Sequence, residues 1–183
     1  MAKAGISTRL IRFVNTCVGH RKGGIANVCI IVACFFGAIS GSGPATVAAL
    51  GAVLIPAMVE RGGFSAPFAT ALMATASSIA IVIPPSIAFV VYASITGVSI
   101  GDMFMAGIVP GILMGLALIV VVMLEVHKNH VVPSNVQKAS AKERLDAFKD
   151  AFWGFLMPVI ILGGIYGGIF TPTEQQPFQL YMA

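Results

Sequence analysis

Long uncharged segments alternate with short charged ones along the chain, and this pattern predicts membrane helices. Residues 23–58 contain no Asp, Glu, Lys or Arg, and neither do residues 62–101. Uncharged, mostly apolar runs of this length are typical of membrane proteins, because a helix needs about 20 apolar residues to cross a bilayer. The pattern therefore predicts an all-α integral membrane protein.

Residues 23–61 are predicted to form a re-entrant helical hairpin. A helix over residues 25–39 would be about 22 Å long, against about 30 Å of hydrocarbon, and the apolar run over residues 47–58 is shorter still. Between the two runs lies Ser40-Gly41-Ser42-Gly43-Pro44, which is a poor helix former. Two short apolar arms around a polar turn favour a hairpin. One kinked span or two short spans would also fit this segment.

Residues 62–101 are predicted to form a discontinuous transmembrane helix. A single helix of this length would extend about 60 Å, far more than a bilayer needs. Pro84 and Pro85 interrupt it, because two prolines remove two backbone donors and disfavour helical geometry in the residue before them. We expect helices over 66–83 and 87–96 with an unwound joint between them, and we expect Asp102 to cap the next helix.

The basic segments predict the orientation. Residues 1–22 carry five basic residues and no acid, and their apolar residues recur at helical spacing. This predicts a basic amphipathic helix at the membrane interface, although the end of an upstream span would look the same. Residues 127–150 form the one long polar loop. Because Lys and Arg are enriched on the cytoplasmic side, both segments are expected there.

The rest of the chain is predicted to hold one full span and the start of another. Residues 102–126 form the cleanest transmembrane helix, and an amphipathic helix over 141–152 is expected to lead back into the membrane. Trp153 is expected at the membrane entry, where aromatic residues are common. Residues 151–174 are apolar and rich in glycine.

Composition agrees with a membrane protein and excludes several functions. The chain is 57% hydrophobic and only 10% charged, whereas soluble domains carry about 25% charged residues. The net charge of +4 comes from the membrane flanks, so no nucleic acid is expected as a partner, and membrane lipid is. The apolar segments hold no acid and no nucleophile–base pair, so the chain is not expected to be an enzyme.

The two helix interruptions are the candidate site. Discontinuous helices in transporters offer half-helix N-termini to anionic groups and unwound carbonyls to sodium ions. The predicted half-site has hydroxyls and backbone groups from both interruptions: Ser40, Gly41, Ser42, Gly43, Thr46, Ser77, Ser78, Pro84, Pro85 and Ser86. Sodium is assigned to Ser42, Thr46 and Ser86, and no other cofactor is expected. Alternatively, each hydroxyl bonds only to its own helix.

Three long runs carry a resemblance to a known family. They are GAISGSGPATVAALGAVLIPAM, ATASSIAIVIPPSIAFVVYASITGVSIGDMFMAGIVPGILMG and GGIYGGIFTPTE. Over residues 4–174 the chain resembles the large membrane subunit of TRAP (tripartite ATP-independent periplasmic) transporters.

The resemblance implies a function and a fold. It implies a sodium-coupled, elevator-type importer in the bacterial inner membrane, multi-pass, with a small membrane subunit and a periplasmic substrate-binding protein as partners. The substrates would be small organic acids such as C4-dicarboxylates. The family fold is an inverted repeat, and each repeat has a hairpin and a broken helix. Its first sodium site and part of its substrate site map by motif position onto Ser40–Gly43 and Pro84–Ser86. Many relatives have Asp at the position of Thr46.

The chain also departs from the family pattern. Family members are more than twice this length, so the chain corresponds to the first repeat, with residues 151–174 as the start of the second, and is expected not to transport alone. Residues 175–183 depart from the Ala-Ala-Ala that usually follows Thr-Pro-Thr-Glu. Plausible codons for these residues, read in a shifted frame, restore Ala-Ala-Ala, so the tail is interpreted as frameshifted.

Two other functions remain open from the residues alone. One is another elevator-type sodium/organic-acid symporter that works without a binding protein. The other is a non-transporting structural membrane protein in which Gly and Ser let helices pack closely.

Overall fold

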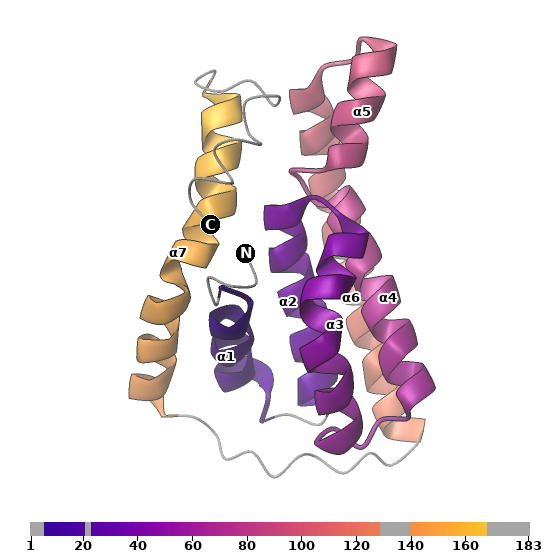
Figure 1. Cartoon of the computed structure of the whole chain (residues 1–183), viewed down its shortest axis with the longest axis vertical. Helices are drawn as coiled ribbons and strands as arrows, with labels where there is room; N and C mark the ends of the chain where they lie inside the picture. The colour runs from indigo at the N-terminus through magenta and orange to yellow at the C-terminus, as the bar shows by residue number, and fades with distance from the viewer. Residues whose placement is uncertain (1–5, 21–22, 129–139, 168–183) are drawn as a thin grey trace.

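The fold is entirely helical over the residues that the structure describes. The structure is a computed structural model, and it describes residues 6–20, 23–128 and 140–167. These segments hold seven helices and no strand: α1 (Ile6–Val18), α2 (Gly24–Ser40), α3 (Gly43–Glu60), α4 (Ala66–Val82), α5 (Ile87–Thr96), α6 (Ile100–Lys128) and α7 (Ala141–Tyr166). Figure 1 shows them roughly aligned along the long axis of the molecule. The prediction of an all-α protein with long apolar helices is confirmed.

A two-residue turn joins α2 and α3 into a helical hairpin. α2 ends at Ser40, and Gly41 follows with a φ of 62°, a left-handed conformation that glycine adopts without steric cost. Ser42 then caps α3, because its hydroxyl accepts a backbone N–H of the first turn at 3.5 Å. Pro44 sits within that turn, where its missing N–H removes no helical hydrogen bond. The turn therefore lies within the predicted interruption but is shorter, because Ser40, Gly43 and Pro44 belong to the helices.

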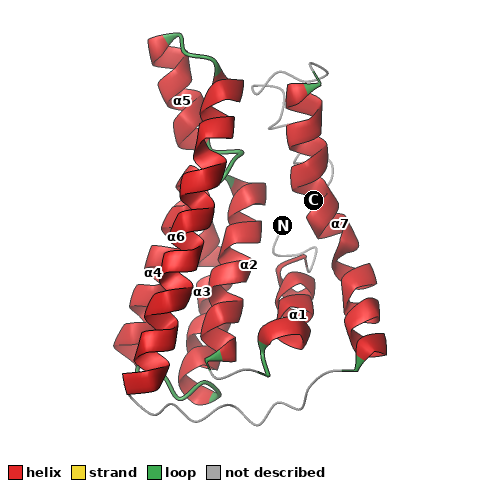
Figure 2. Ribbon diagram, turned by 180° about the vertical axis from the view of Figure 1, so that it is seen from behind, coloured by secondary structure: helices red, strands yellow, loops and turns green. Residues whose placement is uncertain are grey.

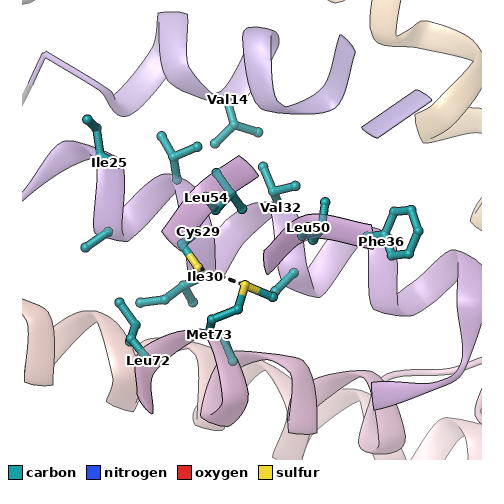
Figure 3. Packing of buried hydrophobic residues seen from close by; sticks show 14 of the residues in the cluster. Val14, Ile25, Cys29, Ile30, Val32, Phe36, Leu50, Leu54, Leu72 and Met73 are labelled. Carbon is teal, nitrogen blue, oxygen red and sulfur yellow. Dashed lines mark hydrogen bonds between the residues drawn. The ribbon is translucent and has the colours of Figure 1, made fainter. Parts of the chain in front are cut away.

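The core is built around α2, which contacts α1, α3, α4 and α6. Figure 3 shows Cys29 of α2 pointing toward Met73 of α4, with the two sulfur atoms 3.6 Å apart. Leu54 of α3 closes the cluster and is buried. Nearer the turn, α2 and α4 approach closely: a Cβ added at Gly37 would lie 2.6 Å from Ala80 Cβ. The hairpin is therefore held to α4 along its length.

α4 and α5 form one helix that is broken at the predicted prolines. The two helices meet at an angle of 41° around Pro84-Pro85. α5 starts after Ser86, whose hydroxyl accepts the Phe89 N–H at 3.4 Å. α6 packs directly on this joint, because a Cβ at Gly107 would lie 2.4 Å from the Val82 oxygen. The break is thus enclosed by helix packing on the α6 side.

The hairpin reaches only part of the way along the molecule. In Figure 1 the turn between α2 and α3 lies beside the joint between α4 and α5, and α5 continues beyond it. The beginnings of α2 and α4 and the ends of α3 and α6 lie together at the opposite end. The hairpin therefore starts and finishes at one end of the molecule.

Helix lengths set limits on how many segments can cross a membrane. α3 and α6 are each long and apolar enough, while α2, with 17 residues, is shorter. The bent pair α4–α5 also qualifies as one broken span, and so do the two halves of α7, residues 142–152 and 156–166. The described residues therefore contain two to four segments of spanning length.

α1 and α7 lie side by side against α2, as Figure 2 shows from behind. Leu10 and Val14 of α1 are buried, so protein covers the apolar face that the sequence predicts to lie on the membrane surface. Arg12 Nη1 lies 3.3 Å from Asp150 Oδ2 of α7. The apolar face of a short helix is stabilised by any apolar neighbour, and here α2 and α7 supply one.

The structure differs from two further predictions, which concern the start of α6 and the boundary before α7. α6 begins at Ile100, and the Ser99 hydroxyl accepts the Asp102 N–H at 3.3 Å. The prediction that Asp102 caps this helix is therefore wrong: Ser99, an equally good capping residue, takes the position, and Asp102 lies in the first turn.

α7 is one helix with a 46° bend, so the predicted domain boundary between residues 150 and 151 falls inside it. The Trp153 side chain and residues 168–183, with the predicted frameshifted tail, lie outside the described residues.

Glycine-to-alanine substitutions test the α2–α4 contact. Gly163 of α7 has no heavy atom within 4 Å of an added Cβ, so Gly163→Ala should stabilise the purified chain by up to ~1 kcal/mol through helix propensity. Gly37→Ala brings the same propensity but crowds Ala80, and overpacking costs ~1–3 kcal/mol. We expect a lower thermal midpoint for Gly37→Ala and an equal or higher one for Gly163→Ala, by circular dichroism in detergent. A midpoint at or above wild type for Gly37→Ala would contradict the close packing.

Candidate functional site

The turn of the hairpin and the break between α4 and α5 are in direct contact. The Ile87 N–H, at the start of α5, donates a hydrogen bond to the Gly41 carbonyl at 3.3 Å. A Cβ added at Gly41 would lie 2.6 Å from the Pro85 oxygen, so the two backbones meet without an intervening side chain. The two interruptions that the sequence singles out therefore lie in contact and make one candidate site.

Three hydroxyl-bearing residues of the turn form a hydrogen-bonded cluster. Thr46 is fully buried, and its hydroxyl donates to the Ser42 carbonyl at 2.9 Å. The Ser40 and Thr46 oxygens are 3.2 Å apart. The Ser42 N–H donates to the Ser40 hydroxyl at 3.3 Å. The turn is thus held by its own side chains, and its hydroxyl oxygens keep lone pairs that can accept further bonds.

Ser86 plays the corresponding role at the break. It is buried, its hydroxyl donates to the Ile81 carbonyl at 2.5 Å and also accepts the Phe89 N–H at the start of α5. The carbonyl near the end of α4, which the prolines leave without its usual helical partner, is satisfied by this side chain. One hydroxyl therefore links the end of α4 to the start of α5.

Ser77 and Ser78 are only partly brought to the site. Both hydroxyls donate to the Ala74 carbonyl of their own helix, at 2.7 and 3.3 Å, which is the alternative that the sequence leaves open. Ser78 is exposed, whereas the Ser77 backbone borders the turn, because a Cβ at Gly43 would lie 3.2 Å from the Ser77 oxygen. Ser77 therefore borders the turn with its carbonyl group, while its hydroxyl bonds to its own helix.

Ile87 is the site member that sequence reasoning misses. Its N–H lies at the contact together with the carbonyls of Pro85 and Ser77, which the sequence does predict, but isoleucine is not a residue type that signals chemistry. The available signal is Gly41 itself, since a glycine between two serines in an apolar run marks a position where another backbone can approach.

Helix ends supply the electrostatics of the site. α2 and α4 end there, and α3 and α5 begin there, so two partly negative and two partly positive helix termini converge. Residues 23–59 and 62–101 contain no Asp, Glu, Lys or Arg. The described residues also hold no cluster of three His, Cys, Asp or Glu side chains suited to a metal ion. The site therefore offers oxygen ligands and backbone N–H groups without formal charge.

A family model described as "Tripartite ATP-independent periplasmic transporter, DctM component" matches residues 1–182. The chain belongs to this family. It is 47% identical over 95% of its length to the C4-dicarboxylate TRAP transporter large permease protein DctM of Pseudomonas aeruginosa, of which it covers 40%. It is also 47% identical to the isethionate TRAP transporter permease protein DctMQ of Oleidesulfovibrio alaskensis, covering 95% of this chain and 27% of that one.

A third relative widens the range of named substrates. The ectoine TRAP transporter large permease protein TeaC of Halomonas elongata is 45% identical over 95% of this chain and 40% of its own. All three relatives are named as transporter permeases, so the prediction that the chain is not an enzyme is confirmed. The chain spans about two fifths or less of the length of these relatives.

A pair of glycine substitutions tests the contact between turn and break. Gly41 and Gly97 each follow a helix in a left-handed conformation, with φ of 62° and 72°, but only Gly41 has a neighbour within 4 Å of an added Cβ. Gly97→Ala should cost ~1 kcal/mol for the strained backbone, and Gly41→Ala should cost a further ~1–3 kcal/mol for the clash with Pro85. Thermal unfolding of the purified chain in detergent measures both. Equal losses in the two variants would show that the turn does not touch the break.

Proposed function

We propose that this chain is part of the large permease subunit of a sodium-coupled TRAP importer of small organic acids such as C4-dicarboxylates. The observation that carries the proposal is the contact between the Gly41 turn and the Pro84-Pro85 break in a chain of this family. Two interrupted helices that meet backbone to backbone are the arrangement with which secondary transporters bind ions and substrates inside a membrane.

Sodium is the ion that suits these groups. As a hard cation it is bound by oxygen ligands, and we assign it to the hydroxyls of Ser42, Thr46 and Ser86 together with carbonyls near Gly41 and Pro84. The two helix C-termini add partial negative charge at this place. This supports a monovalent cation, because the segments supply no carboxylate that would balance a higher charge.

The acid is bound, in this proposal, by the starts of α3 and α5. Residues 23–59 and 62–101 contain no Arg or Lys to pair with a carboxylate, and helix N-termini attract anions through their unpaired N–H groups. The relatives named for C4-dicarboxylates support that class first, and those named for isethionate and ectoine support related small solutes. A sodium ion beside the bound acid would also offset its charge.

The hairpin is proposed to be re-entrant, in a multi-pass protein of the bacterial inner membrane. Its arms start and finish at one end of the molecule, and its turn stops beside the α4–α5 joint, which supports an excursion to mid-membrane depth. In the complete elevator-type permease, a second repeat would supply the other half of the site. A small membrane subunit and a periplasmic substrate-binding protein would complete the transporter, and the first repeat alone would not transport.

Two serines that cap helices test the sodium assignment. The hydroxyls of Ser65 and Ser86 each accept a helix N–H at 3.4 Å, so Ser→Ala at either position removes one helix cap, worth ~1 kcal/mol. Ser86→Ala also removes the hydrogen bond to the Ile81 carbonyl. The background is a full-length hybrid in which residues 1–174 replace the matched part of the Pseudomonas aeruginosa permease. In proteoliposomes, Ser86→Ala should raise the sodium concentration for half-maximal uptake about tenfold, equivalent to ~1.4 kcal/mol, and Ser65→Ala should leave it unchanged.

Equal sodium dependence in the two hybrids would contradict the assignment. The unsubstituted hybrid must also need the binding protein for uptake. Uptake without a binding protein would favour the alternative of an elevator-type symporter that works alone.

A further inference from the structure

The start of α2 is buried and has no side-chain cap. Gly23 precedes the helix with a φ of 70°, and it has no side chain that accepts an N–H of the first turn. A helix leaves its first N–H groups without partners inside the helix, so each needs an acceptor from outside. Gly23, Gly24, Ile25 and Ala26 are all buried, so this place is shielded from bulk water.

Packing explains why position 23 carries no capping side chain. A Cβ added at Gly23 would lie 2.8 Å from Val126 Cγ2 and 3.2 Å from Val122 Cγ1 of α6. Its positive φ also differs from the extended conformation of a capping Ser, Thr or Asp. On the other side, a Cβ added at Gly24 would clash with the Gly19 carbonyl oxygen. The usual capping residues therefore do not fit, and the first N–H groups need a smaller acceptor.

Asn27 places an unpaired acceptor over the same turn. The residue is 6% exposed, and its Oδ1 has no hydrogen-bond partner among the residues that the structure describes. Its backbone N–H bonds to the Gly23 carbonyl at 3.0 Å, which closes the first turn of α2. Side chains on a helix lean toward its N-terminus, so the Asn27 amide is directed to the start of α2. An unpaired buried carbonyl oxygen is costly, so a donor is expected there.

We propose that a buried water molecule binds between Asn27 and the first N–H groups of α2. The water accepts a hydrogen bond from an N–H of the first turn and donates one to Asn27 Oδ1. Water suits this pair because it both donates and accepts, whereas an anion has no proton to give to Oδ1. It is also small enough for a place that is closed by Val122, Val126 and Gly19. Buried waters typically make about three hydrogen bonds to groups of this kind.

The place of this water in the fold gives it a structural role. α2 starts at the end of the molecule where α6 finishes, as Figure 1 shows, and the last turn of α6 carries His127 and Lys128. Charged residues of this kind lie at the membrane surface, so water is at hand. The bound water caps α2 while α6 stays in contact with Gly23. The water site lies at the opposite end of α2 from Gly41 and does not depend on the proposed transport function.

Replacing Asn27 by leucine, which has nearly the same shape, separates a bridged amide from an unpaired one. If the water joins the two sets of groups, Asn27→Leu leaves buried N–H groups without a partner. We then expect the thermal midpoint of the purified chain in detergent to fall by about 2–4 °C. If Oδ1 is simply unpaired, the same substitution removes a destabilising group, and an equal or higher midpoint would overturn the proposal.

Water-edited solid-state NMR of the chain in lipid bilayers measures the contact directly. The Ile25 and Ala26 amides should gain magnetisation from water several-fold faster than the amide of Val32, which is fully buried further along α2. In Asn27→Leu they should slow to the Val32 rate, while Val32 itself stays unchanged. Slow transfer to both amides in the wild type would overturn the proposal. So would dephasing of the Asn27 amide by phosphorus-31, because a lipid phosphate would then occupy the site.

Discussion

The hydrogen bond from the Ile87 N–H to the Gly41 carbonyl joins the turn between α2 and α3 to the break between α4 and α5. A lipid environment cannot solvate backbone groups, so each interruption has to be satisfied from within the protein. Ser42, Ser86 and Thr46 satisfy part of this demand within each interruption, and the Gly41–Ile87 bond links the two. The close packing of α2 on α4 at Gly37 and of α6 on the break at Gly107 positions the partners for it.

This constraint also explains why the site has a polar character without charge. Four helix ends meet at one point, and their dipoles supply both signs of partial charge. Two C-terminal ends and nearby hydroxyl oxygens suit a sodium ion, while two N-terminal ends suit a carboxylate. An ion and an anion bound side by side would stabilise each other, which gives the proposed coupling a physical basis. Ionised side chains would be expensive to hold in the interior of a membrane.

Much of the fold follows from the residues that end and start helices. Gly-Ser-Gly-Pro ends α2 and starts α3, and Pro84-Pro85 separates α4 from α5, because these residues restrict the backbone locally and leave few alternatives. The position of Ser99 rather than Asp102 at the start of α6 was not predictable with the same certainty, since both residue types cap helices well. The covering of α1 by α2 and α7 depends on long-range packing that a helical repeat of apolar residues does not encode.

Some residues of the candidate site could likewise be predicted from the sequence, and others could not. Thr46 and Ser86 could be singled out as hydroxyls beside an interruption, and the structure buries both. That the Ser77 carbonyl borders the turn, and that Ile87 takes part at all, depends on how two segments more than thirty residues apart come together. Sequence reasoning finds the interruptions because each is local, and the structure adds that they touch.

Hydrogen–deuterium exchange of the full-length hybrid permease, with and without sodium, tests the central claim most directly. If the turn and the break form one sodium site, sodium should slow exchange in peptides that cover residues 40–46 and 84–89. A peptide from the middle of α6, away from the site, should not change. Exchange that is unaffected by sodium in both site peptides, or slowed in only one of them, would contradict the account.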